Sequence, residues 1–309
     1  MAFKKIIFIV GPTGVGKSAV AFELVKRLKG EIISCDAMQV YREVSIINNK
    51  PSPEIQRAIP HYLIGTISAQ KDFNVADFRK KALKAVAVIH KKNKIPIFVG
   101  GSGLYMSVLL DGIFEDAGAN EALRAKLEAL ASRKGTEFLY ARLKKIDPAS
   151  AKKIHPNDLR RMIRALEVFE TSKAPISQLQ TKREGLWGKY DIHIFALNRE
   201  REKLYSLIDR RVEQMMEDGA VEEVKGLLSA KKKISKTARA MIGVKEIEGF
   251  LNGDHDMARA KYLMKRNTRH YAKRQLTWFR REKRLSWVMM DTSATPLGVA
   301  QKILNKVSP

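Results

Sequence analysis

Short runs of apolar residues alternate along the chain with segments in which apolar residues recur every three or four positions. The first run, at residues 6–10, is rich in β-branched side chains and contains no polar residue. Such a run is typical of a strand that is buried on both faces of a parallel sheet. The segment that follows places Ala21, Leu24, Val25 and Leu28 at helical spacing, and it therefore predicts an amphipathic helix.

The same alternation continues towards the C-terminus. Strands are expected at residues 31–34, 61–65, 95–99, 191–197 and 287–290. Helices are expected at residues 77–91, 122–134, 137–145, 159–171 and 263–284, in the segment after residue 199 and in the tail. Strands that alternate with helices favour an α/β protein with a parallel sheet.

Residues 121–190 differ from the rest of the chain, because they contain charged helices and no run typical of a buried strand. Strand character returns after them. The pattern indicates an all-helical insertion, and the α/β core is then built from both sides of it. We expect the core at residues 1–115 and 189–309, the second part with basic C-terminal helices, and the insertion at residues 116–188.

A phosphate-binding motif follows the first strand directly. It reads Gly11, Pro12, Thr13, Gly14, Val15, Gly16, Lys17 and Ser18, a complete G-x-x-x-x-G-K-[ST] pattern. In such a loop, backbone N–H groups surround phosphate oxygens, and the N-terminus of the next helix adds partial positive charge. Lys17 supplies a mobile cation, and the Ser18 hydroxyl can ligate a magnesium ion. The core is therefore predicted to be a P-loop-type parallel sheet flanked by helices, although the loop does not say which phosphate compound it holds.

Asp36 and a glycine-rich segment at residues 100–103 follow two further strands. Because the carboxyl ends of parallel strands line the ligand crevice, both are expected near the phosphate loop. By position alone, Asp36 fits a catalytic carboxylate and a helix cap or turn residue equally well. The glycines fit close ligand approach, and they also fit a strained turn.

The composition favours a polyanionic partner. Lys and Arg number 58 against 33 Asp and Glu, which gives a formal net charge of +25. Nucleic acid is the first candidate and an anionic membrane surface the second, while a generally lysine-rich surface would give the same composition. The single cysteine, Cys35, excludes a disulfide framework and suits a reducing cytoplasm. Neither a membrane span nor a signal peptide is expected, since no apolar run is long enough and the first one leads straight into the phosphate loop.

Ordered blocks extend from the phosphate loop almost to the C-terminus. The earlier ones are residues 11–18, 31–41 (EIISCDAMQVY), 50–51 (KP), 60–63 (PHYL), 75–78 (VADF) and 99–105 (VGGSGLY). The later ones are residues 155–158 (HPND), 164–168 (RALEV), 242–246 (IGVKE) and 271–280 (YAKRQLTWFR). Together they resemble the motifs of the tRNA dimethylallyltransferase family, and kinases do not share the later blocks.

The resemblance implies that a dimethylallyl group moves from dimethylallyl diphosphate to the exocyclic N6 of the adenosine 3′-adjacent to the anticodon, in tRNAs that read codons beginning with U. The products are N6-isopentenyladenosine and diphosphate, and Mg²⁺ is required. The phosphate loop then holds the diphosphate rather than ATP, with Mg²⁺ on Ser18. Asp36 corresponds to the carboxylate that orients the amine and takes its proton, Thr13 lines the reacting centre, and Arg211 reaches the diphosphate, with Arg210 as the alternative.

The resemblance also implies contacts with tRNA, whose target base must leave its stack to enter the pocket. The insertion and the last long helix would hold RNA phosphates, although a solvated helix face remains the alternative for each arginine. The last helix carries basic residues on one stripe, at positions 266, 269, 273, 280 and 284. The implied contacts are Asp36, Ala37, Met38 and Gln39; Ser102; Arg124; Arg160, Arg161, Met162, Ile163 and Arg164; and Arg239, Ala240, Met241, Ile242, Gly243 and Val244.

The chain departs from the family pattern in one loop and at three single positions. Residues 45–51 read SIINNKP where DIGTAKP is usual, and Ala37, Ser102 and Val244 stand for Ser, Thr and Tyr. None of these changes touches the phosphate loop or Asp36. Two rival functions are a small-molecule phosphotransferase that uses ATP and a nucleic-acid-binding module without turnover. A monomer is expected.

Overall fold

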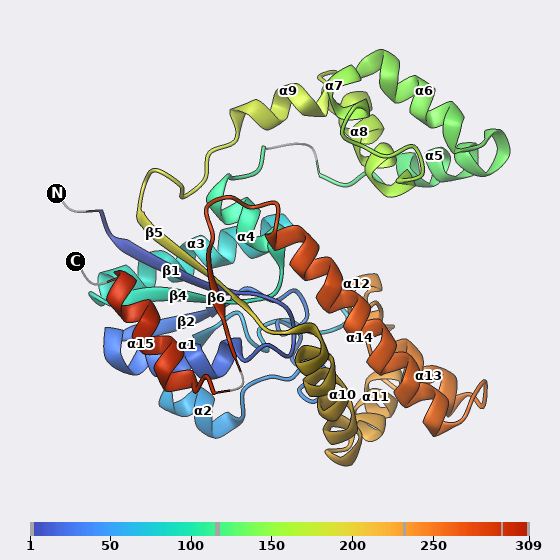
Figure 1. The fold of residues 1–309 in the computed structure, drawn as a ribbon. Coiled ribbons are helices and arrows are strands. Elements are labelled where there is room, and N and C mark those ends of the chain that lie inside the picture. The colour runs from blue at the N-terminus through green and yellow to red at the C-terminus, as the bar shows by residue number, and fades with distance from the viewer. Residues whose placement is uncertain (1–2, 115–117, 231–232, 292, 308–309) are drawn as a thin grey trace. The chain divides into compact units, whose positions relative to one another are not determined.

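The computed structural model describes residues 3–114, 118–230, 233–291 and 293–307 (Figure 1). The chain divides into two compact units, one formed by Met1–Leu109 with Trp187–Pro309 and the other by Leu110–Leu186. The boundary that we expected between residues 115 and 116 lies outside the described residues. The first unit contains the sheet, and the described part of the second is helical.

The sheet is six-stranded and parallel, which confirms the expected α/β fold. Its strand order is β3-β2-β4-β1-β5-β6. Because all the strands run the same way, the loops after β1, β4 and β2 leave the sheet side by side at one edge. The strands are β1 (Lys5–Val10), β2 (Gly30–Ser34), β3 (His61–Tyr62), β4 (Ile95–Gly100), β5 (Asp191–Asn198) and β6 (Ser286–Met289).

Helices cover both faces of the sheet, as its uninterrupted apolar strands require (Figure 1). On one face, α1 (Lys17–Leu28) and α15 (Pro296–Val307) share a core cluster with Ile7 and Ile9. On the other face lie α3 (Val75–Lys91) and α4 (Gly103–Leu110). Phe8 of β1 stacks on Phe98 of β4 with a distance of 4.6 Å between the ring centroids. The strands are thus buried on both sides, as their sequence predicts.

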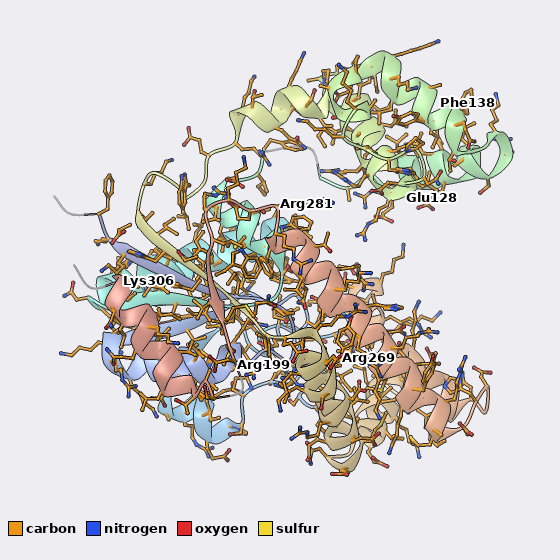
Figure 2. All side chains as sticks on the ribbon, viewed as in Figure 1. Glu128, Phe138, Arg199, Arg269, Arg281 and Lys306 are labelled. Carbon is orange, nitrogen blue, oxygen red and sulfur yellow. The ribbon has the colours of Figure 1, made fainter. Side chains whose placement is uncertain are left out.

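A group of helices lies between β5 and β6 in the chain. It consists of α10 (Arg201–Glu217), α11 (Ala220–Leu228), α12 (Lys236–Arg239), α13 (Val244–Leu251) and α14 (Met257–Phe279). A bidentate pair joins two of them: Arg269 of α14 donates to both carboxylate oxygens of Asp209 on α10, each at 2.8 Å. Figure 2 labels Arg269 among the side chains. The short helix α2 (Pro53–Ala58) precedes β3.

Three element boundaries were clearly predicted wrongly: the end of one strand and both ends of the last long helix. The strand expected at residues 61–65 ends at Tyr62, because Leu63 adopts a left-handed φ of 65°. Helix α14 begins before the expected residue 263, since the Asp256 carboxylate caps it by accepting the Arg259 N–H at 2.7 Å. It ends at Phe279, so Arg284 lies beyond it and pairs instead with Glu282. The expected stripe of five basic residues on one helix is therefore wrong at its last two members, since Arg280 is the C-cap residue and Arg284 lies further on.

The second unit packs its helices around an apolar core. The helices are α5 (Glu121–Lys134), α6 (Thr136–Ile146), α7 (Pro148–Ala151), α8 (Leu159–Ser172) and α9 (Ile176–Leu179), followed by a 3-10 turn at Gln180–Lys182. Leu139, Leu143 and Leu166 are fully buried there. In the part of the chain that the structure describes, no helix combines the length and the apolar character that crossing a membrane requires.

Candidate active site

The segments that follow β1, β4 and β2 meet at one edge of the sheet, where they line a cavity of about 270 Å³. The phosphate loop, Gly100 and Asp36 contribute to it, and α10 adds Arg211. Arg210 is exposed and does not line the cavity, so the structure favours Arg211 of the two candidates. The expected site residues that line it are Thr13, Gly14, Gly16, Lys17, Ser18, Asp36, Gln39 and Arg211.

The backbone of the phosphate loop depends on Gly11. Its φ is 138°, and a Cβ there would lie 2.4 Å from the backbone oxygen of Leu197 in β5. No larger residue fits without moving the adjacent strand. The loop therefore leaves β1 in close contact with β5 and turns directly into α1.

Lys17 reaches back across the loop. Its Nζ donates to the backbone oxygens of Gly11 and Pro12 at 2.9 and 2.7 Å. Burial lowers the pKa of Lys17 to about 7; the Arg211 charge adds to this effect and the Asp36 carboxylate opposes it. An ammonium group has three donors, so one remains for a ligand after the two bonds to the loop.

Arg211 and Thr13 are in direct contact although they are far apart in the chain. Nη1 of Arg211 donates to Oγ1 of Thr13 at 3.1 Å. Burial lowers the pKa of Arg211 and the Asp36 carboxylate raises it, but a guanidinium stays charged in either case. A permanently charged Arg211 guanidinium therefore lies beside the Thr13 hydroxyl in the cavity.

Asp36 makes a local turn as well as lining the cavity. Its Oδ1 accepts the backbone N–H of Met38 at 2.9 Å. The residues after Asp36 form turns rather than a helix, so of the structural roles that its position allowed this is the turn and not the helix cap. A carboxylate has two oxygens, so the turn and a catalytic role are compatible.

The segment after Asp36 is held by the loop whose sequence departs from the family pattern. The side-chain amide of Asn48 donates to the Met38 carbonyl at 3.0 Å, and that of Gln39 donates to the Asn49 carbonyl at 3.1 Å. The loop is held in turn by Glu223 of α11, whose carboxylate accepts the backbone N–H groups of Ser45, Ile46 and Ile47. No sequence pattern indicates this role for Glu223, which lies more than 170 positions from the loop along the chain.

Two acceptors that line the cavity lack a partner among the described residues: His61 Nε2 and Asn48 Oδ1. Nδ1 of His61 lies 2.6 Å from the Ile59 carbonyl, which can only accept, so Nδ1 carries the proton. Burial lowers the pKa of His61 and keeps the ring neutral, which leaves Nε2 as an acceptor. Both atoms are therefore buried acceptors without a partner among the described residues.

Several residues expected to contact RNA prove to have structural roles. Met162 and Ile163 lie in the apolar core of the second unit, and Met241 and Val244 are buried in the first. Because these side chains are buried, they are closed to an RNA. Gly243 N–H donates to the Glu246 carboxylate at the start of α13, Ser102 caps α4 by accepting the Tyr105 N–H at 3.4 Å, and Arg239 pairs with Glu248.

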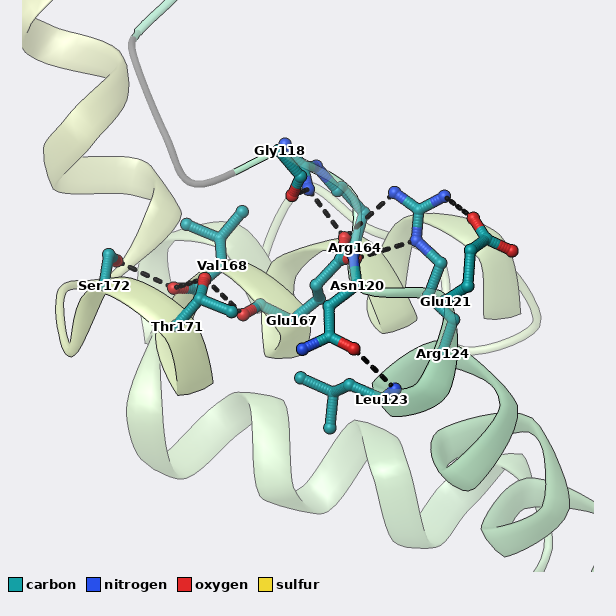
Figure 3. A network of polar contacts seen from close by, with 10 residues as sticks. All are labelled: Gly118, Asn120, Glu121, Leu123, Arg124, Arg164, Glu167, Val168, Thr171 and Ser172. Carbon is teal, nitrogen blue, oxygen red and sulfur yellow. Dashed lines mark hydrogen bonds and ion pairs between the residues drawn. The ribbon is translucent and has the colours of Figure 1, made fainter. Parts of the chain in front are cut away.

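In the second unit, Arg124 and Arg164 surround a buried carboxylate (Figure 3). Glu167 is fully buried and accepts from Arg124 Nε at 2.9 Å, Arg124 Nη2 at 3.0 Å, Arg164 Nη1 at 2.6 Å and Asn120 N–H at 2.7 Å. Burial raises the pKa of Glu167, but these hydrogen bonds outweigh it and hold the pKa below its ordinary value. Both arginines are thus committed to folding, while Arg160 and Arg161 are exposed.

A parallel sheet with a phosphate loop, a lysine, an arginine and a carboxylate around one cavity defines a P-loop-type α/β protein whose cavity suits a phosphorylated ligand. The family model described as IPP transferase matches residues 39–282. The chain belongs to the IPP transferase family, and this confirms the resemblance seen in the sequence blocks.

Relatives named as tRNA dimethylallyltransferases are similar in sequence to this chain along most of its length. The tRNA dimethylallyltransferase of Halothermothrix orenii is 42% identical over 288 residues, which cover 93% of this chain and 88% of that protein. The tRNA dimethylallyltransferase of Carboxydothermus hydrogenoformans is 45% identical over 285 residues, which cover 92% of this chain and 91% of that protein.

Solved structures are similar as well. The full-length tRNA isopentenylpyrophosphate transferase from Bacillus halodurans matches with a TM-score of 0.72 and 38% identity, over 99% of this chain and 96% of that one. A eukaryotic dimethylallyltransferase acting on tRNA matches with a TM-score of 0.83 and 29% identity, over 97% of this chain and 78% of that one.

Proposed function

We propose that this protein transfers the dimethylallyl group of dimethylallyl diphosphate to the exocyclic N6 of the adenosine 3′-adjacent to the anticodon, in tRNAs that read codons beginning with U. The observation that carries the proposal is that Lys17, Ser18, Asp36 and Arg211 line one cavity. Because one chain supplies all four, a monomer is sufficient. We place the reaction in the cytoplasm, where tRNA is available and the free thiol of Cys35 suits the reducing conditions.

The donor's allylic C–O bond breaks more easily when negative charge on the departing diphosphate is neutralised. The third donor of Lys17, the charge of Arg211 and the N–H groups at the start of α1 are available for this task. They act in a partly desolvated cavity, where each interaction is stronger than in water. Diphosphate leaves with the bonding electron pair.

The adenine amine is a weak nucleophile, because its lone pair is delocalised into the ring. Asp36 lines the same cavity as the donor-binding residues and can accept a hydrogen bond from the amine. As the nitrogen forms its bond to the allylic carbon, one N–H proton passes to the carboxylate. This base catalysis contributes on the order of 10²- to 10⁴-fold.

The cavity suits a magnesium ion by the chemistry of its groups. Ser18 and Asp36 line the cavity and offer hard oxygen ligands. A site with one or two protein oxygens plus substrate phosphates and waters is typical of Mg²⁺. Ser18 is the residue that we assign to the ion, which when bound would add positive charge at the diphosphate.

The test is mass spectrometry of a tRNA with adenosine at the target position after incubation with the protein, Mg²⁺ and dimethylallyl diphosphate. A gain of one dimethylallyl group on that nucleoside supports the proposal. The matched control is the same tRNA with guanosine there, which should remain unmodified. The proposal fails if no prenylated nucleoside forms, and ADP production from ATP and a hydroxyl acceptor would point to a phosphotransferase instead.

Exposed and paired arginines of the second unit should behave differently on substitution. Arg160→Ala should weaken tRNA binding and lower the slope of log K against log salt by about 0.7 to 0.9, because one phosphate contact is lost. Arg164→Ala should instead destabilise the fold by about 1–3 kcal/mol, because it removes a partner of the buried Glu167. Filter binding across a salt series and thermal unfolding measure the two effects.

Lys302→Ala on α15 serves as the control, since it removes the same charge from an exposed position with no implied RNA contact. It should change neither the salt slope nor the unfolding temperature. An unchanged salt slope in Arg160→Ala would remove Arg160 from the interface. An unchanged unfolding temperature in Arg164→Ala would contradict its structural role.

A further inference from the structure

Gln275 of α14 joins two of the loops that form the cavity. Its Oε1 accepts the backbone N–H of Thr13 at 2.8 Å, and its Nε2 donates to the Gly101 carbonyl at 3.0 Å. The side chain is only 5% exposed. Both ends of one buried amide are therefore used, one on the phosphate loop after β1 and the other on the loop after β4.

The fit around this amide is close. A Cβ at position 101 would lie 2.0 Å from Nε2 of Gln275, so any larger residue there would displace the amide from its place on the backbone. A buried polar group without a hydrogen-bond partner costs free energy. The two bonds satisfy Oε1 and Nε2 of Gln275, and with them one backbone group on each loop. The contact is thus built into the packing.

Thr13 is held from two directions as a result. Its N–H is committed to Gln275 and is not available to a phosphate, while its hydroxyl accepts from Arg211. The two partners lie on α14 and α10, which the bidentate pair of Arg269 with Asp209 fastens together. The position of Thr13 relative to Arg211 therefore depends on the hydrogen bond by which α14 holds the phosphate loop.

We propose that Gln275 is a positioning residue for prenyl transfer: it fixes the phosphate loop at Thr13, so that the Thr13 hydroxyl and Arg211 face the donor in their reactive geometry. The inference rests on the proposed function and adds a residue that itself touches no reacting atom. Small misplacements of groups that bind a transition state cost rate more than ground-state binding. The expected signature is therefore a loss in kcat.

Gln275→Met and Gln275→Glu test this role. Met keeps the length of the side chain and loses both hydrogen bonds, so kcat should fall roughly 10- to 100-fold while KM for tRNA stays within about twofold. Ile303→Ala is the matched control: it destabilises a buried site on α15 away from the cavity, and kcat of the folded protein should be unchanged.

Gln275→Glu should make kcat depend on pH in a way that a loss of stability would not. The measurement is made at one temperature, well below that of unfolding. A protonated Glu can accept from Thr13 and donate to Gly101, whereas the carboxylate faces the Gly101 oxygen without a proton. Its kcat relative to that of the unaltered protein should therefore rise as the pH falls. This series decides the question even if Gln275→Met fails to fold.

A double-mutant cycle with Thr13→Ala completes the test. Because Gln275 acts through Thr13, the two losses should be clearly less than multiplicative in the double variant. An unchanged kcat in folded Gln275→Met, a flat pH ratio in Gln275→Glu, or multiplicative losses would each overturn the inference. The proposed function itself fails only if the unaltered protein forms no prenylated tRNA, so the two failures are distinguishable.

Discussion

Asp36→Asn is expected to lower kcat by about 10²-fold or more while binding of tRNA and donor persists. The reason is that an amide cannot accept the proton that the adenine amine releases. Asp36→Ala should lose at least as much. Single-turnover prenylation of tRNA gives the rate of the chemical step, and equilibrium binding gives the affinities separately.

The asparagine variant separates the two roles that the sequence left open. Asp36 Oδ1 accepts the Met38 N–H at 2.9 Å, and the carbonyl oxygen of an asparagine can do the same. The turn should therefore survive while the base is lost. If the carboxylate only capped this turn, Asp36→Asn would be almost fully active, and that result would contradict the mechanism.

Asp256→Asn is the matched control. Asp256 caps α14 by accepting the Arg259 N–H at 2.7 Å and does not line the cavity. The same chemical change at a cap outside the cavity should leave kcat unaltered. A fall in kcat for Asp256→Asn comparable to that for Asp36→Asn would indicate a general effect on the fold rather than a catalytic one.

The sequence predicted the parts of the site that local chemistry determines. The spacing from Gly11 to Ser18 specifies a phosphate loop, and the apolar runs specify the parallel strands that carry it. Asp36 follows one of these strands, and the shared edge of a parallel sheet brings it to the loop. The motif and the sheet topology are therefore sufficient to predict the phosphate loop and the place of Asp36 beside it.

The other contacts of the site join residues that lie far apart in the chain. Arg211 is 198 positions from Thr13, and Gln275 is 262 positions from it. No periodicity or motif specifies which residue of a long helix will meet the loop, since helix packing decides it. The resemblance to a family named Arg211 because its position carries over, but it gave Gln275 no role of its own.

Burial also limits which side chains of the predicted RNA-contact segments can reach an RNA. Residues 160–164 form part of helix α8, whose geometry buries Met162 and Ile163 and exposes Arg160 and Arg161. Likewise, the net charge overstates the cations that are free for RNA. Lys92 and Lys94, for example, hold the buried carboxylate of Glu31 at 3.1 and 2.7 Å. Burial, which the sequence pattern only approximates, decides which charges can reach a partner.

The affinity for dimethylallyl diphosphate should fall as the pH rises above about 7, because Lys17 has a pKa of about 7. Below this pH, Lys17 is charged before the donor arrives. Above it, a proton must be taken up on binding, since the diphosphate favours the charged form. The dissociation constant should then rise roughly tenfold per pH unit until the pKa of the complex is reached.

Calorimetry in buffers of different ionisation enthalpy should detect this proton uptake between pH 7 and pH 9. The donor's own phosphate titrates at about pH 6, so the comparison must be made between variants. Lys17→Arg keeps a charge at every pH and should lose the dependence above pH 7. Lys17→Met should bind about 10²-fold more weakly than the unaltered protein at pH 7, since it loses a charge-assisted hydrogen bond in a desolvated site.

Equal pH profiles for the unaltered protein and Lys17→Arg would show that Lys17 does not titrate in this range. The two carbonyl contacts of Lys17 would then hold a permanently charged ammonium, and the loop would bind the diphosphate without proton uptake. If instead close to one proton is taken up per donor bound at pH 8.5 by the unaltered protein, and none by Lys17→Arg, the titrating group is Lys17. Lys17 would then connect the protonation state of the empty cavity to the charge that the departing diphosphate requires.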